Sequence, residues 1–135
     1  MYKYTKIEMT IREFLLKYSE IDVQPVGQRL DTQVKLENKK SQGIIDTILK
    51  GMNLGEITIH QVEGGKFKFE SIDGGHRKRY IKGFFDGLIR TTDGRYYSEL
   101  SDEERDVFLN YKLSFVIYSD LTVFDIGYIF RTLND

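Results

Sequence analysis

Hydrophobic residues recur at helical spacing in several separate stretches of the chain. The first stretch opens with Thr10 and Glu13, which have the spacing of a capping box, and Ser101 and Glu104 open a later, acidic stretch in the same way. Gly51 follows another stretch at the position where a glycine commonly ends a helix. The pattern predicts helices over residues 10–19, 41–51, 76–85, 101–110 and 122–133.

Other stretches alternate apolar and polar residues, which is typical of strands. Two of them, 56–62 and 66–72, are joined by Glu63-Gly64-Gly65, a strong signal for a hairpin. A third strand is predicted over 112–118. The fold expected from these elements is α+β, a small mixed sheet that contains a hairpin and is flanked by helices, in one domain over 1–135.

The remaining segments are less regular. Residues 21–29 are expected to be extended because Pro25 forces non-helical geometry on the residue before it. Residues 30–40 have many charges and no period, so they form a loop or a weak helix, and 86–97 is a polar connector. His60 alternates with isoleucines on its strand and is expected to be an exposed strand residue rather than a ligand.

The composition excludes cysteine chemistry and limits how the chain could bind nucleic acid or a membrane. The 135 residues carry 20 basic and 21 acidic side chains, so any affinity for nucleic acid must come from a local patch. Without a cysteine the chain has no disulfide, no thiolate metal site and no cysteine nucleophile. The chain does not begin with the apolar core of a signal peptide, and it has no apolar run long enough to span a bilayer. A cytoplasmic location is expected.

Candidate chemistry concentrates where the second strand of the hairpin turns into a helix through Asp73-Gly74-Gly75. The free N–H groups and the positive end of the helix dipole suit an anion, and Arg77 adds a guanidinium that fits phosphate oxygens. Asp73 is a candidate to hold a divalent cation or orient a water. His76 is a candidate phosphate donor, general base or metal ligand. The alternative is a simple turn followed by a solvated basic helix face.

The same region invites a second hypothesis, a module that binds DNA or a protein partner and has no catalysis. Between Gly64 and Arg90 there are seven basic and three acidic residues, a modest local excess. In this hypothesis Lys78, Arg79 and Lys82 form a solvated basic face that holds nucleic acid. Direct nuclease action is less favoured, because Asp73 is the one well-placed acid and two-metal cleavage needs a carboxylate cluster.

The segment around the glycine turn resembles a known family motif. The string Ile72-Asp73-Gly74-Gly75-His76-Arg77 resembles the D-G-x-(H/Q)-R motif of the ParB/sulfiredoxin-like superfamily, in particular the DGQQR/DGQHR branch that includes the amino-terminal domain of GmrSD-type restriction proteins. Further segments resemble that domain in the same order along the chain, namely Pro25 to Arg29, Ile44 to Gly51, Phe84 to Gly87, Phe115 to Tyr118 and Ile129 to Asn134.

The resemblance implies a ParB-like fold and a domain that binds a nucleoside triphosphate with Mg²⁺ and hydrolyses it, within a DNA-processing, restriction or phage-defence protein. Arg77 is then a phosphate ligand, and its removal is expected to leave the unliganded protein's melting temperature unchanged or slightly raised, because a positive charge in the first turn opposes the helix dipole. The implied pocket consists of Asp73 and His76 as catalytic residues, Asp73 also as a metal ligand, and Gln28, Arg29, Gly74, Gly75 and Arg77 as nucleotide and phosphate ligands.

The chain also departs from the family pattern. His76 stands where the GmrSD branch usually has a second glutamine. Gly75 occupies the place of the cysteine that sulfiredoxin needs, which excludes sulfinic-acid reduction. Relatives usually continue into a helical region and often a carboxy-terminal nuclease, so the chain is expected to be truncated at its C-terminal end. Such an absent domain, DNA and a second copy of the chain are the partners that the resemblance suggests.

Overall fold

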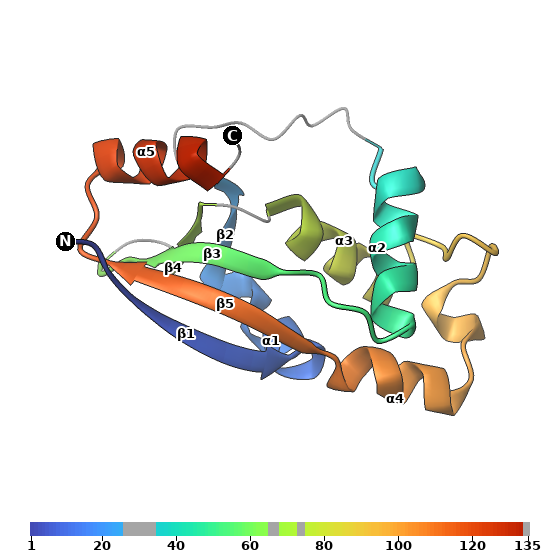
Figure 1. Ribbon diagram of the computed structural model, residues 1–135. Coiled ribbons are helices and arrows are strands. Elements are labelled where there is room, and N and C mark those ends of the chain that lie inside the picture. Colours follow the sequence, from blue (N-terminus) through green and yellow to red (C-terminus); the bar gives the residue numbers. More distant parts are fainter. Residues whose placement is uncertain (26–34, 65–67, 73–74, 134–135) are drawn as a thin grey trace.

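The computed structural model describes residues 1–25, 35–64, 68–72 and 75–133 (Figure 1). The chain is an α+β fold, as the sequence predicts. The elements in order are β1 (Lys3–Thr10), α1 (Ile11–Lys17), η1 (Tyr18–Glu20), β2 (Ile21–Pro25), α2 (Lys39–Leu49), β3 (Glu56–Gln61), β4 (Phe69–Ser71), α3 (Gly75–Phe85), η2 (Tyr97–Glu99), α4 (Asp102–Asn110), β5 (Lys112–Ser119) and α5 (Val123–Leu133).

The strands form one mixed sheet in the order β1-β5-β3-β4-β2. The predicted hairpin is confirmed, because β3 and β4 pair antiparallel, with Ile59 opposite Ser71. β1 pairs antiparallel with β5, whereas β3 with β5 and β2 with β4 pair in parallel. Neither parallel pair was predicted, because parallel neighbours come from distant parts of the chain and leave no local signal.

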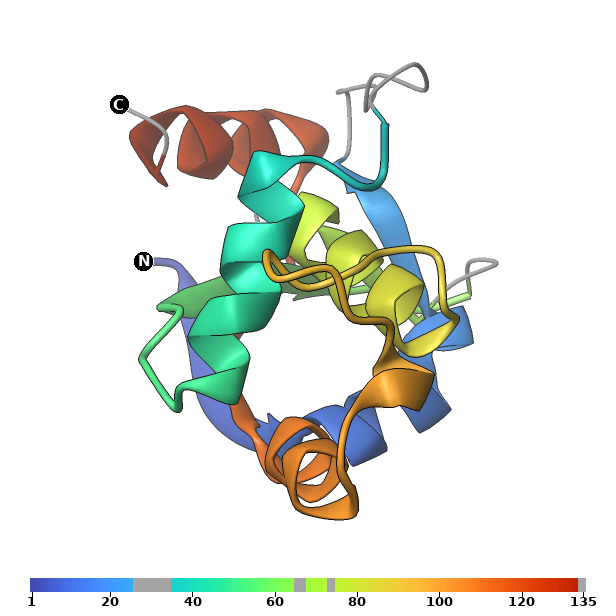
Figure 2. The same ribbon diagram turned by 90° about the vertical axis from the view of Figure 1, so that its right-hand side faces the viewer.

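Two apolar clusters lie on opposite faces of the sheet. The larger one contains Ile57 and Phe115, which face each other on β3 and β5, together with Phe14 of α1 and Phe84 of α3. The smaller one joins Ile72, Ile126 and Ile129 to Tyr118 of β5. Because alternate residues of a strand point to opposite faces, Tyr118 and Phe115 lie on different sides of the sheet. α5 therefore covers the face opposite α1 and α3. It stands apart from the other helices in Figure 1, whereas in the view of Figure 2 its ribbon overlaps the start of α2.

Side-chain caps fix the starts of several helices. The capping box of α1 is present, since Glu13 N–H donates to Thr10 Oγ1 at 3.2 Å, and that of α4 is present between Ser101 and Glu104. α2 begins at Lys39, two residues before the predicted start at 41, because Asn38 caps the helix by accepting from the Ser41 N–H at 2.9 Å. Among the described residues no helix is long and apolar enough to span a membrane.

Candidate functional site

The structure places only part of the predicted site. Gln28, Arg29, Asp73 and Gly74 lie outside the described residues. Gly75 is the first residue of α3. The other predicted residues, His76, Arg77, Lys78, Arg79 and Lys82, are all in α3.

The predicted strand and helix are present on either side of the site, as β4 and α3. β4 ends at Ser71, and the next residue, Ile72, is buried and donates its N–H to the Thr58 carbonyl at 3.0 Å. This bond ties the end of β4 to β3, three residues before α3 begins at Gly75. The first N–H groups of a helix have no partner within that helix and carry the positive end of its dipole.

His76 lies in this first turn and is partly buried, with its ring stacked on Tyr80 at 5.9 Å between centroids. Its buried Nδ1 has no hydrogen-bond partner among the residues that the structure describes. Burial lowers the pKa of His76, and the positive charges of Arg79 and Lys40 lower it further. The ring is therefore neutral at pH 7 and stands in a positive local potential.

The lowered pKa of His76 predicts a loss of stability in acid. A folded-state pKa below the unfolded value of about 6.5 means that folding disfavours the charged ring. This part of the stability is present above the unfolded pKa and is lost as the pH falls through the folded pKa. Between pH 7 and 5 the melting temperature of the wild type should fall more than that of His76→Gln, as differential scanning fluorimetry can measure. Parallel curves for the two proteins would contradict a lowered pKa for this ring.

Arg77 is directed toward the main chain that precedes β3. Its Nη1 donates to the Leu54 carbonyl at 2.6 Å and its Nη2 to the Glu56 carbonyl at 3.2 Å. Gly55 stands between these acceptors, and a Cβ at that position would lie 3.9 Å from Nη1. The guanidinium thus ties α3 to the segment between α2 and β3, a role that was not predicted from the sequence.

Lys78 does not belong to a solvated basic face, which corrects the expectation from the sequence. Its side chain is fully buried, and its ammonium group donates to the Oγ of Ser71, which is also fully buried. Lys78 lies one turn before Ile81, on the side of α3 that faces the core, so the buried side of this helix includes a charged residue. A side chain in this position cannot reach the phosphates of a DNA duplex.

Lys82 and Arg79 lie one turn apart on α3, and both are partly buried and close to Tyr18 of η1. The Lys82 ammonium pairs with Asp86 at 2.7 Å and lies 5.8 Å from the centre of the Tyr18 ring. Arg79 is partly buried, and its charge acts on both His76 and Tyr18. The basic surface expected to hold DNA therefore loses Lys78, and Lys82 is already paired with a carboxylate that follows α3.

The expected metal ligand Asp73 lies outside the described residues. Within the described part of the chain, no group of three or more histidine, aspartate or glutamate side chains is arranged to hold a metal ion. Magnesium binding at Asp73 stays a prediction.

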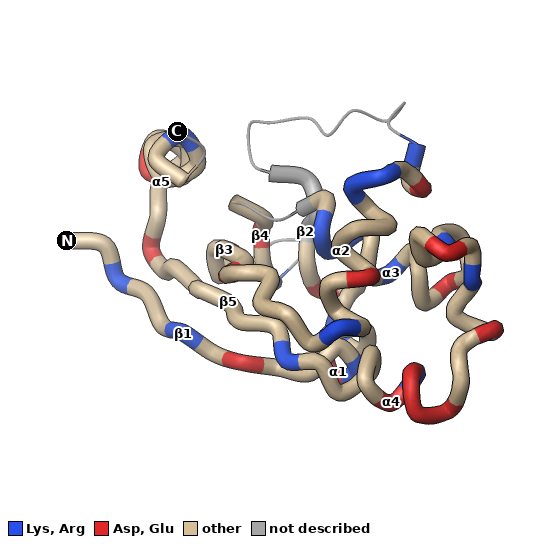
Figure 3. Tube along the Cα trace, turned by 45° about the vertical axis from the view of Figure 1, so that its right-hand side comes forward, with Lys and Arg blue, Asp and Glu red and all other residues tan. Residues whose placement is uncertain are grey.

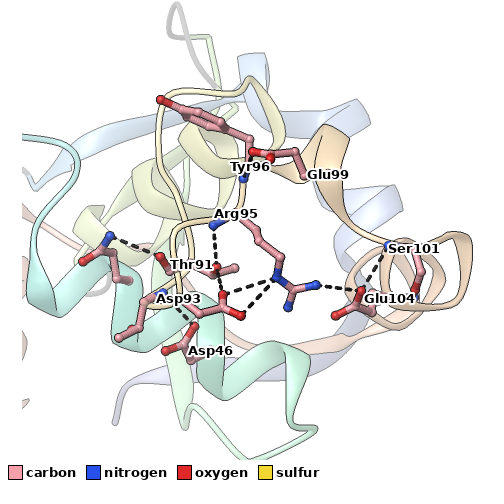
Figure 4. A network of polar contacts seen from close by, with 10 residues as sticks. Asp46, Thr91, Asp93, Arg95, Tyr96, Glu99, Ser101 and Glu104 are labelled. Atoms are coloured by element: carbon pink, nitrogen blue, oxygen red, sulfur yellow. Dashed lines mark hydrogen bonds and ion pairs between the residues drawn. The ribbon is translucent and has the colours of Figure 1, made fainter.

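A polar network beside α2 and α4 was not predicted from the sequence (Figure 4). Arg95 donates to Glu104 at 2.9 Å and pairs with Asp93 at 3.2 Å, and the Thr91 hydroxyl donates to Asp93. The pKa of Asp93 is lowered mainly by the hydrogen bond from Thr91, and then by Arg95. The pKa of Glu104 is lowered mainly by the hydrogen bond from the Ser101 N–H, and then by Arg95. A pocket of about 370 Å³ adjoins the network, next to Asp46 of α2. Because Arg95 pairs with both carboxylates, the network fixes the segment around Asp93 and Arg95 against α4.

The start of α3 and the polar network around Arg95 differ in the charges that surround them. Figure 3 shows basic residues at the start of α2 and acidic residues at the start of α4. Lys40, in the first turn of α2, is one of the charges that act on His76. The start of α3 is therefore the more positive of the two candidate regions.

Comparison with known proteins gives no relative for this chain: no family model matches it, and neither a curated protein nor a solved structure does.

Proposed function

We propose that this chain is a nucleotide-binding domain of the ParB/sulfiredoxin-like kind, which holds the phosphates of a nucleoside triphosphate at the start of α3 and hydrolyses it. The parent protein in this proposal acts in DNA processing or phage defence. The observation that carries the proposal is His76 in the first turn of α3, whose buried Nδ1 has no hydrogen-bond partner among the described residues and on which the positive charges of Arg79 and Lys40 act.

That environment favours an anion for two reasons. The charges of Lys40 in α2 and Arg79 in α3 both act on His76 in the first turn of α3, where the positive end of the helix dipole adds to them. The buried Nδ1 of His76 offers a polar atom with no partner in the described part of the protein. A phosphate oxygen placed there would accept a hydrogen bond from the ring.

The residues take different roles in this proposal. Arg79 and Lys40 attract the phosphates, while Arg77 contributes its charge from a position fixed by the Leu54 and Glu56 carbonyls. His76, which is neutral at pH 7 before the nucleotide binds, takes up a proton when the phosphate binds and donates a hydrogen bond to it. Asp73 would hold Mg²⁺ or orient a water, as the resemblance suggests.

Isothermal titration calorimetry with ATP, GTP and CTP, each with and without Mg²⁺, tests the proposal. A bound phosphate raises the pKa of His76 because an opposite charge favours the protonated ring. Binding near pH 7 should therefore take up protons, which titrations in buffers of different ionisation enthalpy reveal. His76→Gln should abolish this uptake, and Arg79→Ala should weaken binding by about tenfold.

Lys50→Ala is a matched control, because Lys50 follows the last residue of α2 and its removal changes the net charge equally. This variant should bind the nucleotide as the wild type does. If none of the three nucleotides binds at millimolar concentration, the proposal is wrong. Binding that Lys50→Ala weakens as much as Arg79→Ala would also reject the site at the start of α3.

A further inference from the structure

β1 is the outer strand of the sheet and is open along its free edge (Figure 1). Residues Lys3 to Glu8 are exposed, and Ile7 keeps 38% of its surface accessible. No other strand in the described part of the chain pairs with this edge. An open edge of this length presents unpaired N–H and C=O groups that another strand can bind.

The sequence of β1 is suited to antiparallel pairing with itself. A two-fold axis normal to the sheet keeps each face of one copy continuous with the same face of the other, so the sheet extends across the interface. When the axis passes through Ile7, the two Ile7 residues oppose each other. Lys6 of each copy then lies opposite Glu8 of the other.

Charge distinguishes this register from its neighbours. An axis through Lys6 places two lysines opposite each other, and an axis through Glu8 places two glutamates opposite each other; both arrangements are repulsive. An axis through Thr5 places Lys6 opposite Tyr4 and leaves the charges unpaired. Only the register centred on Ile7 gives two opposite-charge pairs among these four registers.

We propose that the free edge of β1 binds β1 of a second copy of this chain, in antiparallel register centred on Ile7. Lys6 also lies 3.3 Å from Glu56 of its own chain, with both side chains largely exposed. In the dimer Lys6 also lies opposite Glu8 of the second copy. The two five-stranded sheets become one continuous sheet.

Sedimentation equilibrium of the whole chain tests the charge pairing. Glu8→Lys replaces two attractive pairs by two lysine pairs and should raise the dimer dissociation constant by roughly tenfold or more. The double variant Lys6→Glu with Glu8→Lys restores opposite charges across the interface and should recover most of the loss. A wild type that stays monomeric at millimolar concentration would overturn the proposal, as would a double variant as weak as Glu8→Lys.

Disulfide trapping tests the register, because the chain has no cysteine of its own. Directly opposed residues have Cα atoms about 4.5–5.5 Å apart, within the range of a disulfide. Ile7→Cys should therefore form a covalent dimer under mild oxidation. Thr5→Cys is the matched control on the same face, since its two copies would be roughly 13 Å apart. Crosslinking of Thr5→Cys that equals or exceeds that of Ile7→Cys would reject this register.

Discussion

Replacing Phe84 with alanine is expected to lower the free energy of unfolding by about 3–5 kcal/mol. The Phe84 ring is fully buried in α3 and packs at 5.2 Å from the Phe108 ring and 5.9 Å from the Tyr97 ring, between centroids. These residues come from α4 and η2, so the ring joins three elements of the main core. Urea denaturation, followed by circular dichroism, measures the loss.

Phe85 is the matched control for this prediction. It is the next residue in α3, is 39% exposed and contacts the Tyr97 ring at 5.2 Å between centroids. Phe85→Ala removes the same atoms from a half-open position and should cost only about 1 kcal/mol. Equal losses for the two variants would show that Phe84 is not a central packing residue.

The elements that were predicted correctly have signals within a few residues of each other. The capping pairs Thr10–Glu13 and Ser101–Glu104 mark the starts of α1 and α4, because the bonds that they form are local. The alternation in β3 and β4 and the glycines between them predicted the hairpin for the same reason. Such features need no knowledge of distant segments.

β1 was not predicted because its pattern depends on β5. Most of its side chains are exposed, so it lacks the regular apolar alternation of a half-buried strand. It pairs with β5 along its whole length, from Lys3 opposite Ser119 to Thr10 opposite Lys112. A contact between the two ends of the chain cannot be found from local periodicity.

The burial of two polar residues, His60 and Lys78, also depends on distant segments and was not predicted. His60 was expected to be exposed, but it is 8% exposed, with Nδ1 3.3 Å from Glu70 and Nε2 accepting from the Leu121 N–H at 3.2 Å. Alternation along β3 places His60 on the face opposite the main core, and the segment leading into α5 covers that face. Lys78 is buried for a comparable reason, because the end of β4 packs against it.

The strand and the helix beside the candidate site were predicted, but the contacts of its side chains were not. The order of strand, glycine turn and helix is local, and the described residues on both sides of the turn follow it. The partners of Arg77 are carbonyl groups more than twenty residues earlier in the chain. Main-chain acceptors carry no residue-type signal, so the sequence could not distinguish a structural arginine from a phosphate ligand.

Arg77→Ala is therefore expected to destabilise the protein without any nucleotide present, contrary to the expectation from the sequence. The variant loses charge-assisted hydrogen bonds to the Leu54 and Glu56 carbonyls, at a cost of about 2–3 kcal/mol. For a chain of this size that corresponds to a fall in melting temperature of about 10 °C. Removing a positive charge from the first turn of α3 offsets only a small part of this loss.

Arg12→Ala is the matched control for Arg77→Ala, because it removes a positive charge from the first turn of a helix without removing hydrogen bonds to the described residues. Arg12 is also a basic residue in the first turn of a helix, α1, but it is exposed and makes no hydrogen bond or ion pair with the described residues. Its removal should leave the melting temperature unchanged or slightly raised, because only the unfavourable interaction with the dipole is lost. Melting curves of both variants and the wild type, each with and without magnesium nucleotide, give the comparison. If Arg77→Ala melts as Arg12→Ala does, the bonds to Leu54 and Glu56 do not stabilise the fold, and Arg77 returns to the role of a phosphate ligand.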